Sequence, residues 1–102
     1  MNGVNLQALY EKLCEKVSTD VLPQIQVNLL GASGLQIKID MEKSLTSISV
    51  WPNGCCDVDF LYAKSERGKF KHYEFTSTEQ SFEVLVGEIY SAIEQGNAGN
   101  KA

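Results

Sequence analysis

The chain has 102 residues, which fits one domain, and its 43% apolar and 9% aromatic residues are typical of a packed globular core. No run of 18 apolar residues occurs, and the N-terminus lacks the basic and apolar regions of a secretory signal. The net charge of −4 argues against nucleic acid or an anionic membrane as the main partner and favours a basic partner.

Three cysteines are present, an odd number, and two of them are adjacent in the chain: Cys14, Cys55 and Cys56. Adjacent cysteines rarely bond to each other without strain, so we expect three reduced thiols and a cytoplasmic protein. Because no C-x-x-C spacing occurs and His72 is the single histidine, we predict neither a metal nor another cofactor.

The chain begins with a pattern typical of a helix over residues 6–19, where apolar residues recur at three- and four-residue steps after the candidate N-cap Asn5. The period then changes to two. Apolar residues alternate with polar ones over residues 25–29 and 35–41, which predicts two half-buried strands joined as a hairpin by Gly31-Ala32-Ser33-Gly34.

Two further strands, over about residues 45–51 and 55–62, are linked by Pro52-Asn53-Gly54. This tripeptide is typical of a three-residue hairpin turn with a glycine bulge. The turn predicts a register in which Trp51 faces Cys55, Ser49 faces Asp57 and Ser47 faces Asp59. The opposite side of the same pair would carry Val50, Ile48 and Thr46 against Cys56, Val58 and Phe60, so one face is apolar and the other polar.

A fifth strand is predicted over residues 70–75, with Tyr73 and Phe75 toward the core, after the basic loop Ser65-Glu66-Arg67-Gly68. A simple hairpin that pairs Tyr62 with Phe70 would reverse this facing, and a bulge near Gly68 would restore it. The last element is a helix over residues 78–95, begun by a Ser77/Gln80 capping box and ended by Gly96. Its predicted buried stripe is Phe82, Leu85, Val86, Ile89 and Ile93.

The predicted fold is α+β with the order α-β-β-β-β-β-α, in which the strands form an antiparallel meander and both helices cover its apolar face. Residues 1–95 form the domain in this prediction, and residues 96–102 form a flexible tail.

Few residues support a catalytic hypothesis. A Cys55–His72 pair could be built across the sheet, and Asp57 with Asp59 could serve as acid and base or hold a divalent ion. A solvated sheet face, or acceptors for a partner's lysine or arginine, accounts for the same residues. We therefore expect a protein that is not an enzyme.

Two candidate contact patches emerge. Trp51 lies on the polar face beside Asp57 and Asp59, and tryptophan is enriched in binding hot spots. A second patch comprises Glu79, Glu83 and Tyr90, which fall together on the flank of the C-terminal helix. Residues 73–94 carry five glutamates and no lysine or arginine. The two patches need not act together.

The stretch from Ser47 to Asp59, with its Trp51-Pro52-Asn53-Gly54 turn, and His72-Tyr73-Glu74-Phe75 before an acidic helix together resemble the TriTu family of bacterial immunity proteins. The resemblance covers about residues 25–93. It implies an α+β protein that binds one cognate toxin domain of a contact-dependent or polymorphic toxin system and blocks its active site. If that domain is a nuclease, its phosphate-binding surface is basic, which suits an acidic inhibitor.

Two alternatives stay open. A small acidic secretion chaperone also combines helices with a meander sheet, but it would be a dimer with an exposed apolar groove, whereas the immunity hypothesis predicts a monomer. A small hydrolase would use Cys55 or the Asp57/Asp59 pair, and a Cys55 thiol no more reactive than a free thiol would count against its cysteine form.

Overall fold

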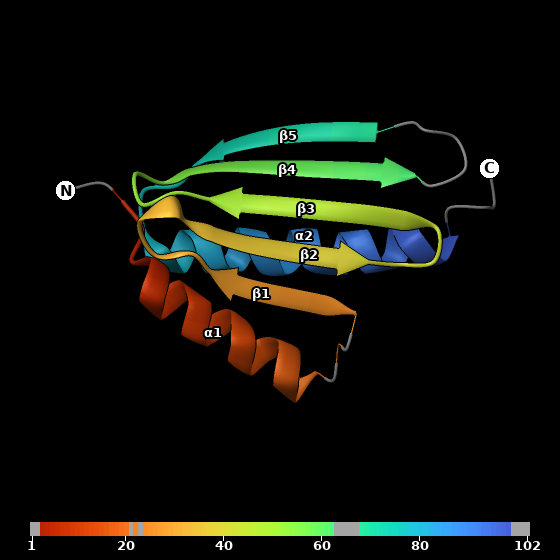
Figure 1. Cartoon of the computed structure of the whole chain (residues 1–102), viewed down its shortest axis with the longest axis horizontal. Helices are drawn as coiled ribbons and strands as arrows, with labels where there is room; N and C mark the ends of the chain where they lie inside the picture. The colour runs from red at the N-terminus through yellow and green to blue at the C-terminus, as the bar shows by residue number, and fades with distance from the viewer. Residues whose placement is uncertain (1–2, 21, 23, 63–67, 99–102) are drawn as a thin grey trace.

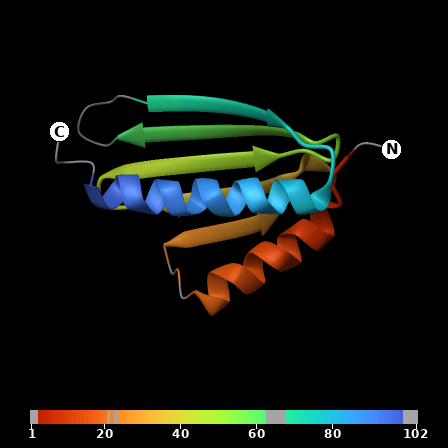
Figure 2. The ribbon, with the colours of Figure 1, turned by 180° about the vertical axis from the view of Figure 1, so that it is seen from behind.

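The computed structural model describes residues 3–20, 22, 24–62 and 68–98 and contains one five-stranded antiparallel sheet with two helices against one of its faces (Figures 1 and 2). The strands lie side by side in chain order, which confirms the predicted meander. The elements, in order, are α1 (Leu6–Thr19), β1 (Ile25–Leu29), a short 3-10 turn (Gly31–Ser33), β2 (Leu35–Asp40), β3 (Ser44–Val50), β4 (Cys55–Tyr62), β5 (Gly68–Glu74) and α2 (Thr78–Ala98).

The first helix follows the sequence prediction. The Asn5 side chain accepts a hydrogen bond from the Ala8 amide at 3.1 Å and so caps one of the free N–H groups of the first turn. Leu6, Leu9 and Leu13 are its buried residues, one stripe at three- and four-residue steps that packs into the core beside β1.

The central hairpin has the predicted register. Val50 pairs with Cys56, Ser49 with Asp57, and Ser47 with Asp59. Gly54 has φ +95°, and a Cβ there would lie 2.1 Å from the Phe75 carbonyl oxygen, so only glycine fits this turn position. The turn is closed by the Trp51 amide donating to the Cys55 carbonyl at 2.9 Å.

The facing of β5 is the one that Tyr73 and Phe75 suggested. Phe70 pairs with Asp59 and Tyr73 with Cys56, a register three residues away from a simple Tyr62–Phe70 hairpin. Tyr73 is half-buried and Phe75 is buried. The same register places Phe70 on the face away from the helices and turns Lys69 and Lys71 toward α2. The loop proposed to contain a bulge lies mostly in residues 63–67, outside the described residues.

The second helix begins at Thr78 as predicted but departs from the prediction in the partner of Gln80 and at its C-terminal end. Ser77 Oγ accepts from the Gln80 amide at 3.1 Å, but Gln80 Oε1 accepts from the Thr76 amide at 2.9 Å and not from Ser77. At the other end, Gly96 does not stop the helix, which runs to Ala98. A Cβ at Gly96 would lie 2.7 Å from Met41 and 2.8 Å from Ser44 Oγ, so this glycine serves close packing of α2 on the sheet.

The burial of Gly96 shows that the packed part of α2 continues past residue 95. Of the proposed tail, only residues 99–102 lie outside the described part. The buried line of α2 is likewise rotated from the predicted stripe: it consists of Ser81, Leu85, Ile89 and Ala92, while Phe82, Val86 and Ile93 are half-buried at its flank. Small residues in this line let the helix approach the sheet closely.

Candidate binding surface

One face of the sheet is uncovered. In the described part of the chain, α2 lies against the other side, behind the sheet in Figure 1 and in front of it in Figure 2, and α1 packs next to β1 and α2 at the β1 edge. We call the uncovered side the open face. Its side chains come from alternate strand positions: Gln26, Asn28, Gln36, Lys38, Asp40, Leu45, Ser47, Ser49, Cys55, Asp57, Asp59, Leu61, Phe70, His72 and Glu74.

On the open face, at the β4–β5 side of the sheet, a histidine lies between two carboxylates. His72 lies opposite Asp57 in the β4–β5 pair, with 2.7 Å between His72 Nδ1 and Asp57 Oδ1. Its other ring nitrogen is 3.4 Å from Glu74 Oε2. The hydrogen bond to Asp57, aided by the one to Glu74, raises the pKa of His72 above 6.5, because both carboxylates favour the imidazolium.

Asp59, the third predicted residue of this patch, lies next to an apolar cluster. It is exposed in the row Ser47–Asp59–Phe70. The adjoining row pairs Leu45 directly with Leu61. Leu45, Leu61 and Phe70 are 49%, 45% and 62% exposed, and they line a shallow hollow together with Asp59. We call these three residues the apolar patch.

Trp51 marks the opposite end of the open face. It follows β3 directly, is 37% exposed, and its ring packs beside Gly34, where a Cβ would lie 3.6 Å from Trp51 Cδ1. The ring is therefore supported from below by backbone and stays accessible from above. An amphipathic aromatic side chain held in this way is available for a contact and needs little ordering to make one.

The six predicted contact residues divide between two sides of the molecule. Trp51, Asp57 and Asp59 share the open face, whereas Glu79, Glu83 and Tyr90 belong to α2 on the helix side. The Tyr90 hydroxyl donates to the Asp20 carboxylate at the end of α1, which lowers the pKa of Asp20 and raises that of Tyr90. Tyr90 thus already links the two helices. The patch of Glu79, Glu83 and Tyr90 is therefore less available to a partner protein than the open face.

The residues of the catalytic hypothesis do not form a catalytic pair. Cys55 lies opposite Glu74, not His72, and both ring nitrogens of His72 are directed at carboxylates. Among the described residues, no hydrogen bond joins a cysteine to His72, and no three His, Cys, Asp or Glu side chains gather as metal ligands would. What the geometry offers is charged and apolar surface for a contact.

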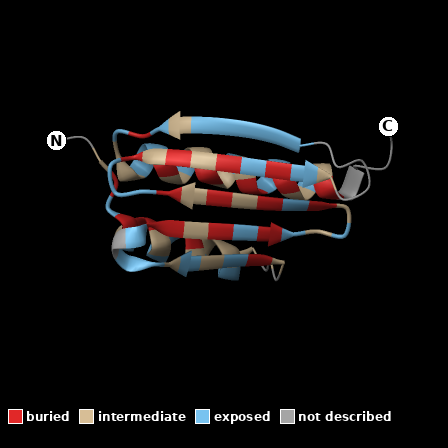
Figure 3. Cartoon of the chain, turned by 45° about the horizontal axis from the view of Figure 1, so that its top comes forward, coloured by how far each residue is buried: buried red, intermediate tan, exposed pale blue. Residues whose placement is uncertain are grey.

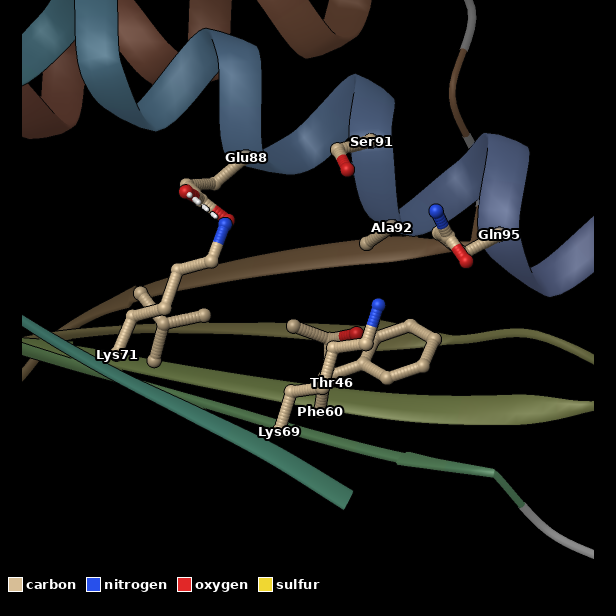
Figure 4. Close-up of a pocket in the computed structure, with 9 residues that line it drawn as sticks. Thr46, Phe60, Lys69, Lys71, Glu88, Ser91, Ala92 and Gln95 are labelled. Atoms are coloured by element: carbon tan, nitrogen blue, oxygen red, sulfur yellow. Dashed lines mark hydrogen bonds and ion pairs between the residues drawn. The ribbon is translucent and has the colours of Figure 1, made fainter. Parts of the chain in front are cut away.

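A second charged cluster, on the helix side, was not predicted. Glu88 of α2, whose side chain is 13% exposed, accepts hydrogen bonds from the Tyr73 hydroxyl and from Lys71 Nζ, the latter at 3.1 Å (Figure 4). The hydrogen bond to Glu88 raises the pKa of Tyr73 to about 12. Lys71 and Glu88 are 17 residues apart in the chain, and the β5 register, which turns Lys71 toward α2, brings them together.

The exposed Leu45 and Leu61 could have been found from the sequence. They continue the alternation that places Ser47 and Asp59 on the polar face, so the predicted β3–β4 register already directs both leucines to the open face. The exposure of Phe70 could not be predicted in this way, because its facing depends on the register between β5 and β4.

Comparison with known proteins adds no relative: no family model, no curated protein and no solved structure matches the chain. Within the described residues, neither helix combines the length and the apolar character that crossing a membrane requires.

Proposed function

We propose that this chain is a protein-binding domain whose open face contacts the partner. The observation that carries the proposal is the composition of that face: an accessible tryptophan at one end, an apolar patch at the other, and the carboxylates of Asp57, Asp59 and Glu74 between them. Aromatic and aliphatic anchors that flank charged groups supply both affinity and orientation in protein interfaces.

The resemblance to the TriTu family suggests what the partner is. We propose an immunity protein, a monomer in the bacterial cytoplasm that holds one cognate toxin domain and blocks its active site. A basic partner surface, such as that of a nuclease, would complement the acidic residues that β4 and β5 place on the open face. The net charge of −4 would further favour rapid encounter at low salt.

If this is an immunity protein, its toxin domain should be encoded beside its gene, and the direct test uses that domain. The purified domain is titrated with the wild-type chain and with Trp51→Ala, and binding is measured by calorimetry. We expect a one-to-one complex and, for Trp51→Ala, a loss of at least about 2 kcal/mol, because truncation removes the large aromatic anchor of the proposed contact. Asp57→Asn with Asp59→Asn should slow association and flatten its salt dependence.

Glu83→Gln is the matched control, since it removes one carboxylate from the helix side of the molecule. It should leave the affinity unchanged. If Glu83→Gln and Tyr90→Phe weaken binding while Trp51→Ala does not, the contact lies on α2 and not on the open face. If the wild-type chain does not bind or neutralise the neighbouring domain, the immunity function is wrong.

One observation favours the secretion chaperone as a second candidate. The apolar patch of Leu45, Leu61 and Phe70 is the kind of surface that a second copy could cover. Light scattering separates the two functions, because a stable dimer supports the chaperone and a monomer supports the immunity protein. Leu61→Lys would dissociate a dimer built on this patch.

A further inference from the structure

Beneath α2, on the side of the sheet away from the proposed contact, the structure contains a small polar cavity. Its volume is about 80 Å³, enough for several water molecules or one compact polar group. The sheet forms the floor of the cavity with polar residues of β3 and β5 and apolar residues of β4, and α2 forms the opposite wall (Figure 4). The lining residues are Thr46, Val58, Phe60, Lys69 and Lys71 from the sheet and Glu88, Ser91, Ala92 and Gln95 from α2.

The charges that line the cavity do not balance. Glu88, its single acid, is already engaged by Lys71 and by the Tyr73 hydroxyl. Lys69 points from β5 toward α2 in Figure 4, and within the described residues it has no carboxylate partner. The cavity therefore carries one positive charge that the described side chains do not neutralise.

Uncharged donors in the same cavity also lack partners. Thr46 is 1% exposed, and its hydroxyl makes no hydrogen bond with any described group, which is costly for a buried polar atom. The Gln95 amide is oriented by the Tyr62 hydroxyl, which donates to Gln95 Oε1 at 2.6 Å. This contact leaves the amide N–H groups of Gln95 free to donate elsewhere.

We propose that this cavity binds a compact carboxylate. One singly charged carboxylate would neutralise Lys69 and accept a charge-assisted hydrogen bond from it, while its second oxygen would accept hydrogen bonds from the Thr46 hydroxyl and the Gln95 amide. The ligand is either a free small acid or the acidic side chain of a bound protein. The site lies on the opposite side of the sheet from the open face, so it does not depend on the proposed contact there.

The test is an NMR titration of the ¹⁵N-labelled chain at pH 7 with sodium acetate, at constant ionic strength maintained with sodium chloride. We expect saturating shifts of the Lys69, Ser91 and Gln95 amides. Lys69→Met keeps the aliphatic stem and removes the charge, so it should weaken acetate binding by about tenfold or more. Lys38→Met, the same change on the open face of β2, should leave acetate binding unaltered.

Thr46→Val gives a second, independent result. Removal of the unpaired Thr46 hydroxyl should weaken acetate binding by about tenfold and yet raise the melting temperature, a combination that loss of folding cannot produce.

A parallel titration with N-acetyl-aspartic acid α-amide, which presents the carboxylate on a peptide unit, separates the two ligand sources. Binding at least as tight as that of acetate assigns the site to a protein side chain, and binding of acetate alone assigns it to a free acid.

Two results would overturn the proposal. One is a linear response to acetate that matches the response to chloride. The other is an unchanged acetate affinity in Lys69→Met together with self-association of that variant. This second result would mean that Lys69 only guards the exposed edge of β5 against another strand.

Discussion

The two faces of the sheet are made by the same strands and differ in what covers them. On the covered face, Ile37, Ile39, Ile48 and Val50 are fully buried beneath the helices, and Figure 3 shows the alternation of buried and less buried positions along β2, β3 and β4. On the open face, the intervening positions are polar, apart from the apolar patch and Cys55. Because side chains alternate between the two faces, one strand places core residues on the covered face and surface residues on the open face.

The covered face is not uniform from one edge to the other. At the β1 edge its residues are Ile25, Val27 and Leu29, next to α1. At the β5 edge the equivalent positions are Lys69 and Lys71. Inward-pointing charges on an edge strand discourage the addition of a further strand, and here they also line the polar cavity. The comparison shows that one face can hold both a dry core and a charged margin.

The largest expected contrast between the faces is in thiol reactivity. Cys55 and Cys56 are neighbours that point to opposite faces, and Cys56 is completely buried. Desolvation raises the pKa of Cys56 from 9.0 to about 12, which lowers its thiolate fraction about a thousandfold at pH 8. Iodoacetamide labelling followed by mass spectrometry should modify Cys55 first. Equal labelling of both thiols in the folded chain would contradict this assignment of faces.

The next contrast is in stability. Ile48 is 0% exposed at the centre of the covered face, so Ile48→Ala should lower the free energy of unfolding by about 2–5 kcal/mol. Its neighbour Ser49 points to the open face, and Ser49→Ala should change stability by less than about 0.5 kcal/mol. Urea denaturation measures both. Similar losses for the two variants would show that the open face is also part of a packed interface.

Two glycines of α2 should give smaller changes in stability, but changes of opposite sign. Gly96→Ala should destabilise the chain by about 1–3 kcal/mol, because the added methyl group meets Met41 and Ser44 Oγ. Gly87 is exposed with nothing within 4 Å of a Cβ, so Gly87→Ala should stabilise the chain by about 0.5–1 kcal/mol. Thermal unfolding should therefore shift in opposite directions, and a stabilising Gly96→Ala would place the end of α2 away from the sheet.

The smallest effect concerns the pH response of the open face. The pKa of folded His72 is raised, so its contribution to stability is complete below pH 6.5 and is lost as the pH rises through the folded pKa. Asp57→Asn removes the main cause and should bring the His72 pKa back toward 6.5. An NMR titration of the imidazole Cε1 proton measures this change directly. A pKa that stays as high in Asp57→Asn would assign the shift to Glu74.

Local patterns predicted much of this structure. The two periods of 3.6 and 2 identified both α-helices and the first two strands, and the Pro52-Asn53-Gly54 turn predicted the register that places Asp57 and Asp59 together on the open face. These features depend on neighbours within a few residues, so a single sequence contains them. For the same reason, the exposure of Leu45 and Leu61 could have been read from that register.

What the sequence by itself determined is therefore the order of the elements and the sorting of polar from apolar side chains in each one. Only the tertiary structure decided the register of β5 and the ion pair of Lys71 with Glu88. It also decided the burial of Gly96 and the placement of Tyr90 and Trp51 on different sides of the molecule. Each of these depends on contacts between elements distant in the chain. Residue spacing carries no record of such contacts, because they depend on how whole elements pair and pack against one another.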